Sequence, residues 1–167
     1  MTTFLLTFFP QLIAGPIVHH AELIPQLKRP CFPDGSFAAL NLGVTIFAVG
    51  LFKKVIVADS LASYASSVFD GVSNGAMPSG AVAWLATLAY TFQIYFDFSG
   101  YSDMAIGLGR MMGFDLPINF RSPYKSRNII EFWRNWHMTL SRFLRDYLYI
   151  RLGGTDAEGE SVMSTSF

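Results

Sequence analysis

The sequence has 167 residues, of which 51% are hydrophobic, 16% aromatic and 14% charged, and its mean hydropathy is +0.36. Because a soluble domain carries about 25% charged residues, too little polar surface remains to cover a small soluble helical protein, and the composition favours a membrane protein. The formal net charge is zero, which argues against nucleic acid as a partner, and the single cysteine, Cys31, excludes an internal disulfide.

Apolar runs without charge predict membrane segments, since a transmembrane helix needs about 20 mainly apolar residues. The first run covers residues 1–18 and contains two prolines. It lacks the basic start of a signal peptide, so we expect the tail of a membrane or re-entrant segment. Residues 36–58 predict a membrane helix, and residues 81–98 predict the clearest one.

The segments between these runs predict loops at 19–34 and 71–80, and a short interfacial helix at 55–69. Lysine and arginine are absent from 59–96 and frequent afterwards. The helix at 81–98 is therefore expected to enter from outside and leave into the cytoplasm. The predicted fold class is all-α: part of a polytopic membrane protein, with about three membrane segments plus amphipathic or re-entrant helices.

Residues 128–150 predict one long amphipathic helix, with Ser126 or Asn128 as its N-cap. At 100° per residue His137 falls inside the apolar arc of this helix. Two interpretations stay open: a packed histidine satisfied by a carbonyl or a tryptophan face, or a site residue that accepts or relays a proton.

Two aspartates, Asp97 and Asp103, lie beside a predicted membrane helix. Ionisable residues at membrane depth indicate function, although both could instead cap a helix end at the water interface. The spacing of His, Cys and carboxylates predicts no metal site. The glycines of AIGLGRMMG are spaced for close helix packing. The basic loop at 121–127 suits either anionic lipid or an anionic cofactor.

Four sequence blocks together resemble one family: FFPQLIAGPIV, GLFKKVIVAD, YTFQIYFDFSGYSDMAIGLGRMMGF and NFRSPYKSRNIIEFWRNWHMTLSRFLRDYLYIRLGG. In order and spacing they resemble the membrane-bound O-acyltransferases, most closely the bacterial branch with alginate O-acetyltransferase and the D-alanyl transfer protein of teichoic acid. Residues 1–154 would be part of that family's membrane domain. Residues 155–167 do not match and predict a disordered tail or a sequence that has left its reading frame.

The resemblance implies a multi-pass protein of the bacterial inner membrane. It would transfer acyl groups, usually acetyl from cytoplasmic acetyl-CoA as co-substrate, to alginate or another cell-envelope acceptor, with periplasmic transfer partners and no permanently bound cofactor. His137, in the W-x-x-W-H block, would face the tunnel in a supporting catalytic role. Five other residues would support the tunnel or the substrate: Asp97, Tyr101, Asp103, Trp133 and Trp136.

The family's principal histidine belongs to a later Trp-His-Gly block, which this sequence does not contain. We therefore expect the chain alone to be inactive. The alternative interpretation is a non-catalytic membrane scaffold or transporter-like protein that uses the same helices for packing only.

Overall fold

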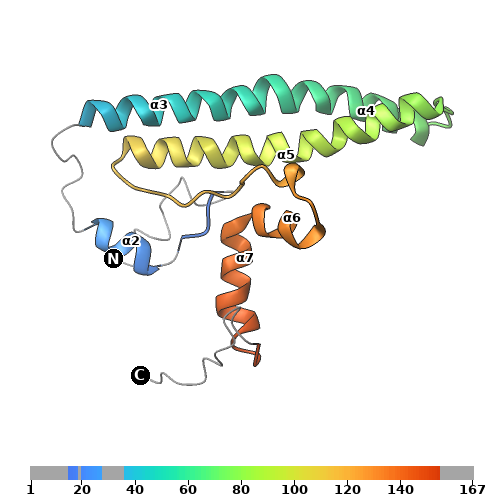
Figure 1. Cartoon of the computed structure of the whole chain (residues 1–167). Helices are drawn as coiled ribbons and strands as arrows, with labels where there is room; N and C mark the ends of the chain where they lie inside the picture. Colours follow the sequence, from blue (N-terminus) through green and yellow to red (C-terminus); the bar gives the residue numbers. More distant parts are fainter. Residues whose placement is uncertain (1–14, 19, 28–35, 155–167) are drawn as a thin grey trace. The chain divides into compact units, whose positions relative to one another are not determined.

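The structure, a computed structural model, describes residues 15–18, 20–27 and 36–154, and the regular secondary structure in these ranges is helical, with no strand among them (Figure 1). They form two compact units. The first unit holds described residues 15, 20–27 and 36–116, and the second holds 16–18 and 117–154. Most of the predicted first membrane segment and the predicted tail lie outside the described residues.

The first unit is dominated by two long antiparallel helical rods (Figure 1). Its elements are α2 (His20–Leu27), α3 (Ser36–Phe52), the π-helical turn η2 (Lys53–Ala58), α4 (Asp59–Ser73) and α5 (Gly80–Met111). Since α3, η2 and α4 follow one another without interruption, the predicted helices at 36–58 and 55–69 form one continuous rod. The predicted loop at 71–80 matches the turn between α4 and α5.

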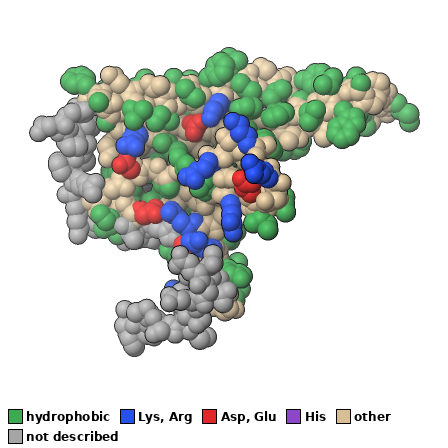
Figure 2. Space-filling view, viewed as in Figure 1, with side chains coloured by type: hydrophobic (Ala, Val, Ile, Leu, Met, Phe, Trp, Pro, Cys, Tyr) green, Lys and Arg blue, Asp and Glu red, His purple; other side chains and the backbone are tan. Residues whose placement is uncertain are grey.

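The rod that contains α3 is apolar and largely exposed. The stretch Phe37–Ser73 is, among the described residues, the one helix long and apolar enough to cross a membrane, and only 11% of its most apolar window is buried. A helix that is apolar all round and still exposed is typical of a membrane span. Phe37 of α3 and Trp84 of α5 are among the exposed hydrophobic side chains, and Figure 2 shows many hydrophobic side chains along the rods. α5, which contains the predicted membrane helix at 81–98, does not meet the same criterion of length and hydropathy, and the predicted number of spans stays a prediction.

The two ends of α5 follow local signals in the sequence. Ser79 caps the start, where its hydroxyl accepts a hydrogen bond from the Val82 amide at 3.5 Å. At the other end Gly113 adopts φ +83°, and the Phe114 amide donates to the Gly109 carbonyl at 2.8 Å. This is the Schellman arrangement, which satisfies the last carbonyls of a helix.

Four glycines bring α3 and α5 into backbone contact. Gly43 faces Gly107, and Gly50 faces Gly100, so the pairs are seven residues apart on each helix. A Cβ atom added to Gly50 would lie 2.6 Å from the Gly100 carbonyl oxygen, and one added to Gly107 would lie 2.7 Å from the Gly43 carbonyl oxygen. Small residues at such positions allow close packing of helices in membranes, as the sequence predicted for the AIGLGRMMG stretch.

One predicted loop is wrong. Residues 20–27 form the helix α2, although Pro25 lies inside it. Tertiary contacts compensate for the proline: Leu23 is fully buried, and the Gln26 side chain exchanges two hydrogen bonds with the backbone of Asp115, at 2.7 and 3.1 Å. Local sequence carries no sign of these partners, which come from 89 residues away.

The second unit consists of short helical pieces: η3 (Pro123–Lys125), α6 (Ile129–Asn135), α7 (Met138–Leu144) and the π-helical turn η4 (Arg145–Tyr149). The predicted continuous helix at 128–150 is therefore wrong in one respect, because it is interrupted between α6 and α7.

The glycine contacts give a direct test. Gly50→Ala should destabilise the first unit by about 1–3 kcal/mol, because the added methyl overlaps the α5 backbone. Gly80→Ala is the matched control: a Cβ there meets nothing within 4 Å, so stability should hold or rise by up to about 1 kcal/mol. Thermal unfolding in detergent, followed by circular dichroism, measures both. Equal stability of the two variants would contradict the close contact.

Candidate active site at the break between α6 and α7

The start of α6 is fixed by a local capping arrangement. The Asn128 side chain accepts a hydrogen bond from the Glu131 amide at 2.8 Å, and the Glu131 carboxylate accepts one from the Arg127 amide at 2.9 Å. Such reciprocal bonds satisfy amides that have no partner inside a helix. Of the two caps predicted from the sequence, the structure therefore selects Asn128.

His137 lies at the break itself, in the left-handed conformation with φ 45° and ψ 55°. The expectation that His137 occupies the apolar arc of one continuous helix is therefore wrong. Left-handed backbone is uncommon outside glycine, although histidine and asparagine adopt it more readily than most residues. The surrounding structure must hold this conformation in place.

A preceding loop supplies the partners that hold the break open. The last carbonyl of α6, on Asn135, accepts a hydrogen bond from the Arg121 amide at 3.1 Å. The first amide of α7, on Met138, donates to the Asn119 carbonyl at 2.9 Å. Both groups sit at helix ends, where intrahelical partners are missing. The break is thus satisfied by backbone bonds that periodicity cannot reveal.

Asn119 joins the loop to His137 and to α7. It is 1% exposed, and its Oδ1 accepts a hydrogen bond from the Thr139 hydroxyl at 2.6 Å. The same Oδ1 lies 3.3 Å from His137 Nδ1. Thr139 is also buried, and its hydroxyl oxygen accepts a bond from the Ile17 amide at 3.0 Å. The sequence alone suggested no role for Asn119, although this residue begins the fourth block of the family resemblance.

These contacts select one form of the imidazole. Because an amide oxygen only accepts hydrogen bonds, the contact with Asn119 calls for the tautomer of His137 that carries its proton on Nδ1. In this tautomer Nε2 is the ring nitrogen that carries the acceptor lone pair. Burial lowers the pKa of His137 below its ordinary value of 6.5, since desolvation disfavours the charged ring. At neutral pH the ring is therefore uncharged and able to accept a proton.

Aromatic rings surround the histidine. Phe120 stacks on His137 with ring centroids 6.5 Å apart, and Trp136 meets Phe120 edge-on at 5.2 Å. Phe132 stacks on Trp136 at 5.5 Å and touches Trp133 at 5.5 Å. The two predicted tryptophans thus belong to one aromatic cluster with His137, although Trp133 is 57% exposed.

Asp97 and Asp103 are engaged in ion pairs within the first unit. Asp97 lies 2.5 Å from Lys54 Nζ, and Asp103 lies 2.6 Å from Lys53 Nζ. Both aspartates are inside α5, so the alternative that they cap a helix end is wrong. Tyr101, which lies between them in the sequence, is half-buried. Their predicted role in supporting a tunnel stays a prediction. The adjacent lysines in an otherwise apolar rod are the signal that could have identified these partners.

Comparison with known proteins places this sequence in a family. Residues 4–167 match the membrane-bound O-acyltransferase family, a range that extends past residue 154, where the sequence blocks were expected to stop matching. The chain belongs to that family. It is 55% identical over 148 residues to a peptidoglycan O-acetyltransferase of Helicobacter pylori, and that alignment covers 89% of this chain and 28% of the relative.

Other relatives in this family carry related names. A probable alginate O-acetylase of Pseudomonas aeruginosa is 53% identical over 146 residues, which is 87% of this chain and 27% of that protein. A teichoic acid D-alanyltransferase of Bacillus subtilis is 28% identical over 148 residues, which is 89% of this chain and 37% of that protein. The resemblance inferred from the sequence blocks is therefore confirmed, and the chain spans well under half the length of these relatives.

The lowered pKa of His137 predicts a pH dependence of stability. Between the folded pKa and about 6.5 the unfolded chain binds more protons than the folded chain, so stability falls as the pH is lowered through this range. His137→Asn, which keeps a residue tolerant of left-handed backbone, should lose less stability between pH 7.5 and pH 5.5. Thermal unfolding of both proteins in detergent gives the comparison, and equal losses would refute the burial of His137.

Proposed function

We propose that this chain forms the hydroxyl-holding part of a membrane O-acyltransferase that acetylates an exported polysaccharide of the bacterial cell envelope. Membership of the family and the names of relatives that are 53–55% identical support the reaction class. The observation that carries the proposal is the position of His137 at the helix break, where its Nδ1 lies 3.3 Å from Asn119 Oδ1 and burial lowers the pKa of the ring.

The chemistry follows from the acceptor nitrogen of that ring. Nε2 of His137 accepts a hydrogen bond from the hydroxyl of the group that first receives the acetyl, and it orients that oxygen toward the carbonyl carbon of an acetyl thioester. The oxygen–carbon bond forms, the carbon–sulfur bond breaks, and the hydroxyl proton ends on the departing thiol. The base that carries this proton would be the histidine of the family's Trp-His-Gly block, which lies in a segment that this sequence does not contain.

The setting of the reaction is part of the proposal. We assign the protein to the inner membrane, as a multi-pass protein with about three membrane segments in this stretch. The second unit carries seven basic and two acidic side chains among its described residues, which favours a cytoplasmic position by the positive-inside rule. The thioester, acetyl-CoA, would arrive from that side, and periplasmic partner proteins would receive the acetyl group.

A chimera tests the proposed function. The matching 148-residue segment of the Helicobacter pylori relative is replaced by this chain's sequence, and the chimera is expressed in a strain that lacks its own enzyme. Acetate released by alkali from isolated peptidoglycan measures the product. The chimera should restore acetylation, and His137→Asn should reduce it by about 10²-fold or more, as expected for loss of a group in proton transfer.

The same substitution at another histidine, His20→Asn, is the matched control and should leave acetylation within about twofold. If the unaltered chimera stays at background while it inserts in the membrane, the segment only packs and the proposed function is wrong. If His137→Asn retains full acetylation, the role of His137 is wrong.

A further inference from the structure

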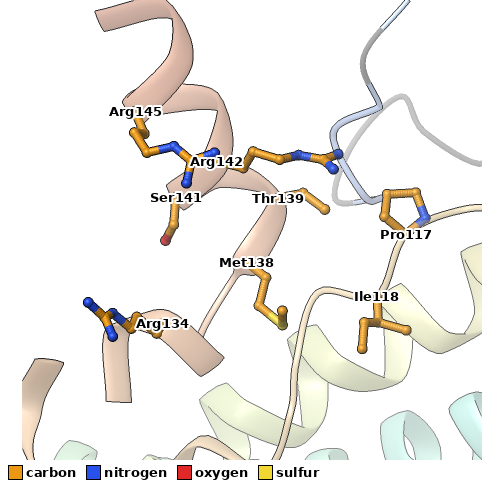
Figure 3. A pocket seen from close by; sticks show the side chains of 8 residues that line it. All are labelled: Pro117, Ile118, Arg134, Met138, Thr139, Ser141, Arg142 and Arg145. Atoms are coloured by element: carbon orange, nitrogen blue, oxygen red, sulfur yellow. The ribbon is translucent and has the colours of Figure 1, made fainter. Parts of the chain in front are cut away.

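The outer face of α6, formed by Ile129, Ile130 and Trp133, is apolar and exposed. These side chains are 67%, 64% and 57% exposed, and at 100° per residue they fall within an arc of about 100° of the helix. Arg134 is exposed next to this arc, and Figure 3 shows it pointing away from Met138. The described residues therefore leave uncovered the kind of surface that a water-soluble helix turns inward.

The opposite face attaches α6 to its own unit. Phe132 stacks on Trp136 with ring centroids 5.5 Å apart, and the Tyr124 ring lies 5.9 Å from Phe132. Asn135 Nδ2 donates a hydrogen bond to the Ser126 hydroxyl oxygen at 3.4 Å. These contacts fix the rotation of the helix about its axis. The outer face is therefore directed away from the side chains that pack α6.

Basic side chains flank both ends of α6. Lys125 and Arg127 are exposed in the segment that leads into the helix. Arg121 is exposed beside the last turn, because its amide donates a hydrogen bond to the Asn135 carbonyl at 3.1 Å. Together with Arg134, these residues give the helix cations on both sides of its apolar arc.

The charge around α6 is almost all positive. Residues 117–135 contain four basic side chains and one acidic side chain, Glu131, whose carboxylate already accepts a hydrogen bond from the Arg127 amide. The helix has seven residues, so it is about 10 Å long. This length is close to the Debye length of about 8 Å at physiological ionic strength. The four cations therefore act on one stretch of surface.

An apolar arc with flanking cations matches the surface of an anionic membrane. Helices that lie in the plane of the membrane interface combine tryptophan and aliphatic side chains on one face with lysine and arginine beside them. Tryptophan is enriched at the level of the headgroups, and basic side chains near a leaflet attract anionic lipid. An apolar protein partner would cover the arc without using the cations.

We propose that the outer face of α6 is inserted in the interface of a membrane leaflet that contains anionic phospholipid. Its three apolar side chains lie against the acyl chains, and the four flanking cations lie among the headgroups. Since α6 ends two residues before His137, this contact would hold the helix break at a fixed depth in the membrane. The inference goes beyond the proposed function and does not depend on acyl transfer.

A spin label measures the position of α6. The 167-residue chain with Cys31→Ser and Ile130→Cys is labelled with a nitroxide in vesicles of equal parts phosphatidylcholine and phosphatidylglycerol. Collisions with oxygen report contact with lipid, and collisions with a nickel chelate report contact with water. Met77→Cys, at a site 98% exposed in the turn between α4 and α5, is the matched control. The ratio of oxygen to nickel collisions should be at least fivefold higher at residue 130.

Two charge variants test the role of the cations. Lys125→Gln with Arg127→Gln should lower the collision ratio at residue 130 at least twofold, because it removes half of the flanking charge. Arg145→Gln with Arg151→Gln removes the same charge from exposed positions outside α6 and its flanks, and it should leave the ratio unchanged. Circular dichroism checks that each variant keeps its helical content.

The measurement is repeated in the chimera described above, freed of other cysteines, so that the remaining segments of a relative are present. Where the chimera does not insert, the result for the 167-residue chain decides. Three outcomes overturn the proposal: a ratio at residue 130 equal to that at residue 77, suppression of both kinds of collision by a covering protein segment, or equal effects of the two charge variants. Acetylation enters none of these measurements, so its loss leaves them intact.

Discussion

The arrangement of the second unit depends on one buried side chain, Asn119. The backbone carbonyl of Asn119 accepts a hydrogen bond from the first amide of α7. Its side-chain oxygen accepts one from the Thr139 hydroxyl and contacts His137 Nδ1. Together with the bond from the Arg121 amide to the Asn135 carbonyl, these bonds compensate for the interruption of the helix between α6 and α7. In a continuous helix His137 would lie with the other residues of the apolar arc. A buried polar network of this kind stabilises one geometry because each broken member leaves an unsatisfied partner.

The first unit is governed by a different constraint, the close approach of two helix backbones. The glycine pairs between α3 and α5 leave no room for side chains at their contact. At the start of the η2 turn, Lys53 and Lys54 pair with Asp103 and Asp97 of α5. In a protein that lies in lipid, such pairing limits the cost of charged groups beside apolar rods. The glycine contacts thus set the distance between the two rods. The ion pairs set how the two rods are aligned along their length.

Local sequence patterns predicted much of the fold. The charge-free runs predicted the rods, the loop at 71–80 matched the turn between them, and Asn128 proved to be one of the two expected caps. Long-range partners could not be predicted from a single sequence. The break at His137 needs bonds from residues 119 and 121, and α2 needs the backbone of Asp115. Periodicity describes a helix by its neighbours in sequence, so it fails where distant groups replace the helical hydrogen bonds.

The central claim is that Asn119 acts on acyl transfer by holding His137. A double-mutant cycle in the chimera tests it directly, with acetyl transfer measured for Asn119→Ala, His137→Asn and the double variant at equal amounts of folded protein. If Asn119 works through His137, the double variant should be no slower than His137→Asn alone. If the two losses multiply, Asn119 acts independently of His137, and the account of the helix break as the organising element of the site is wrong.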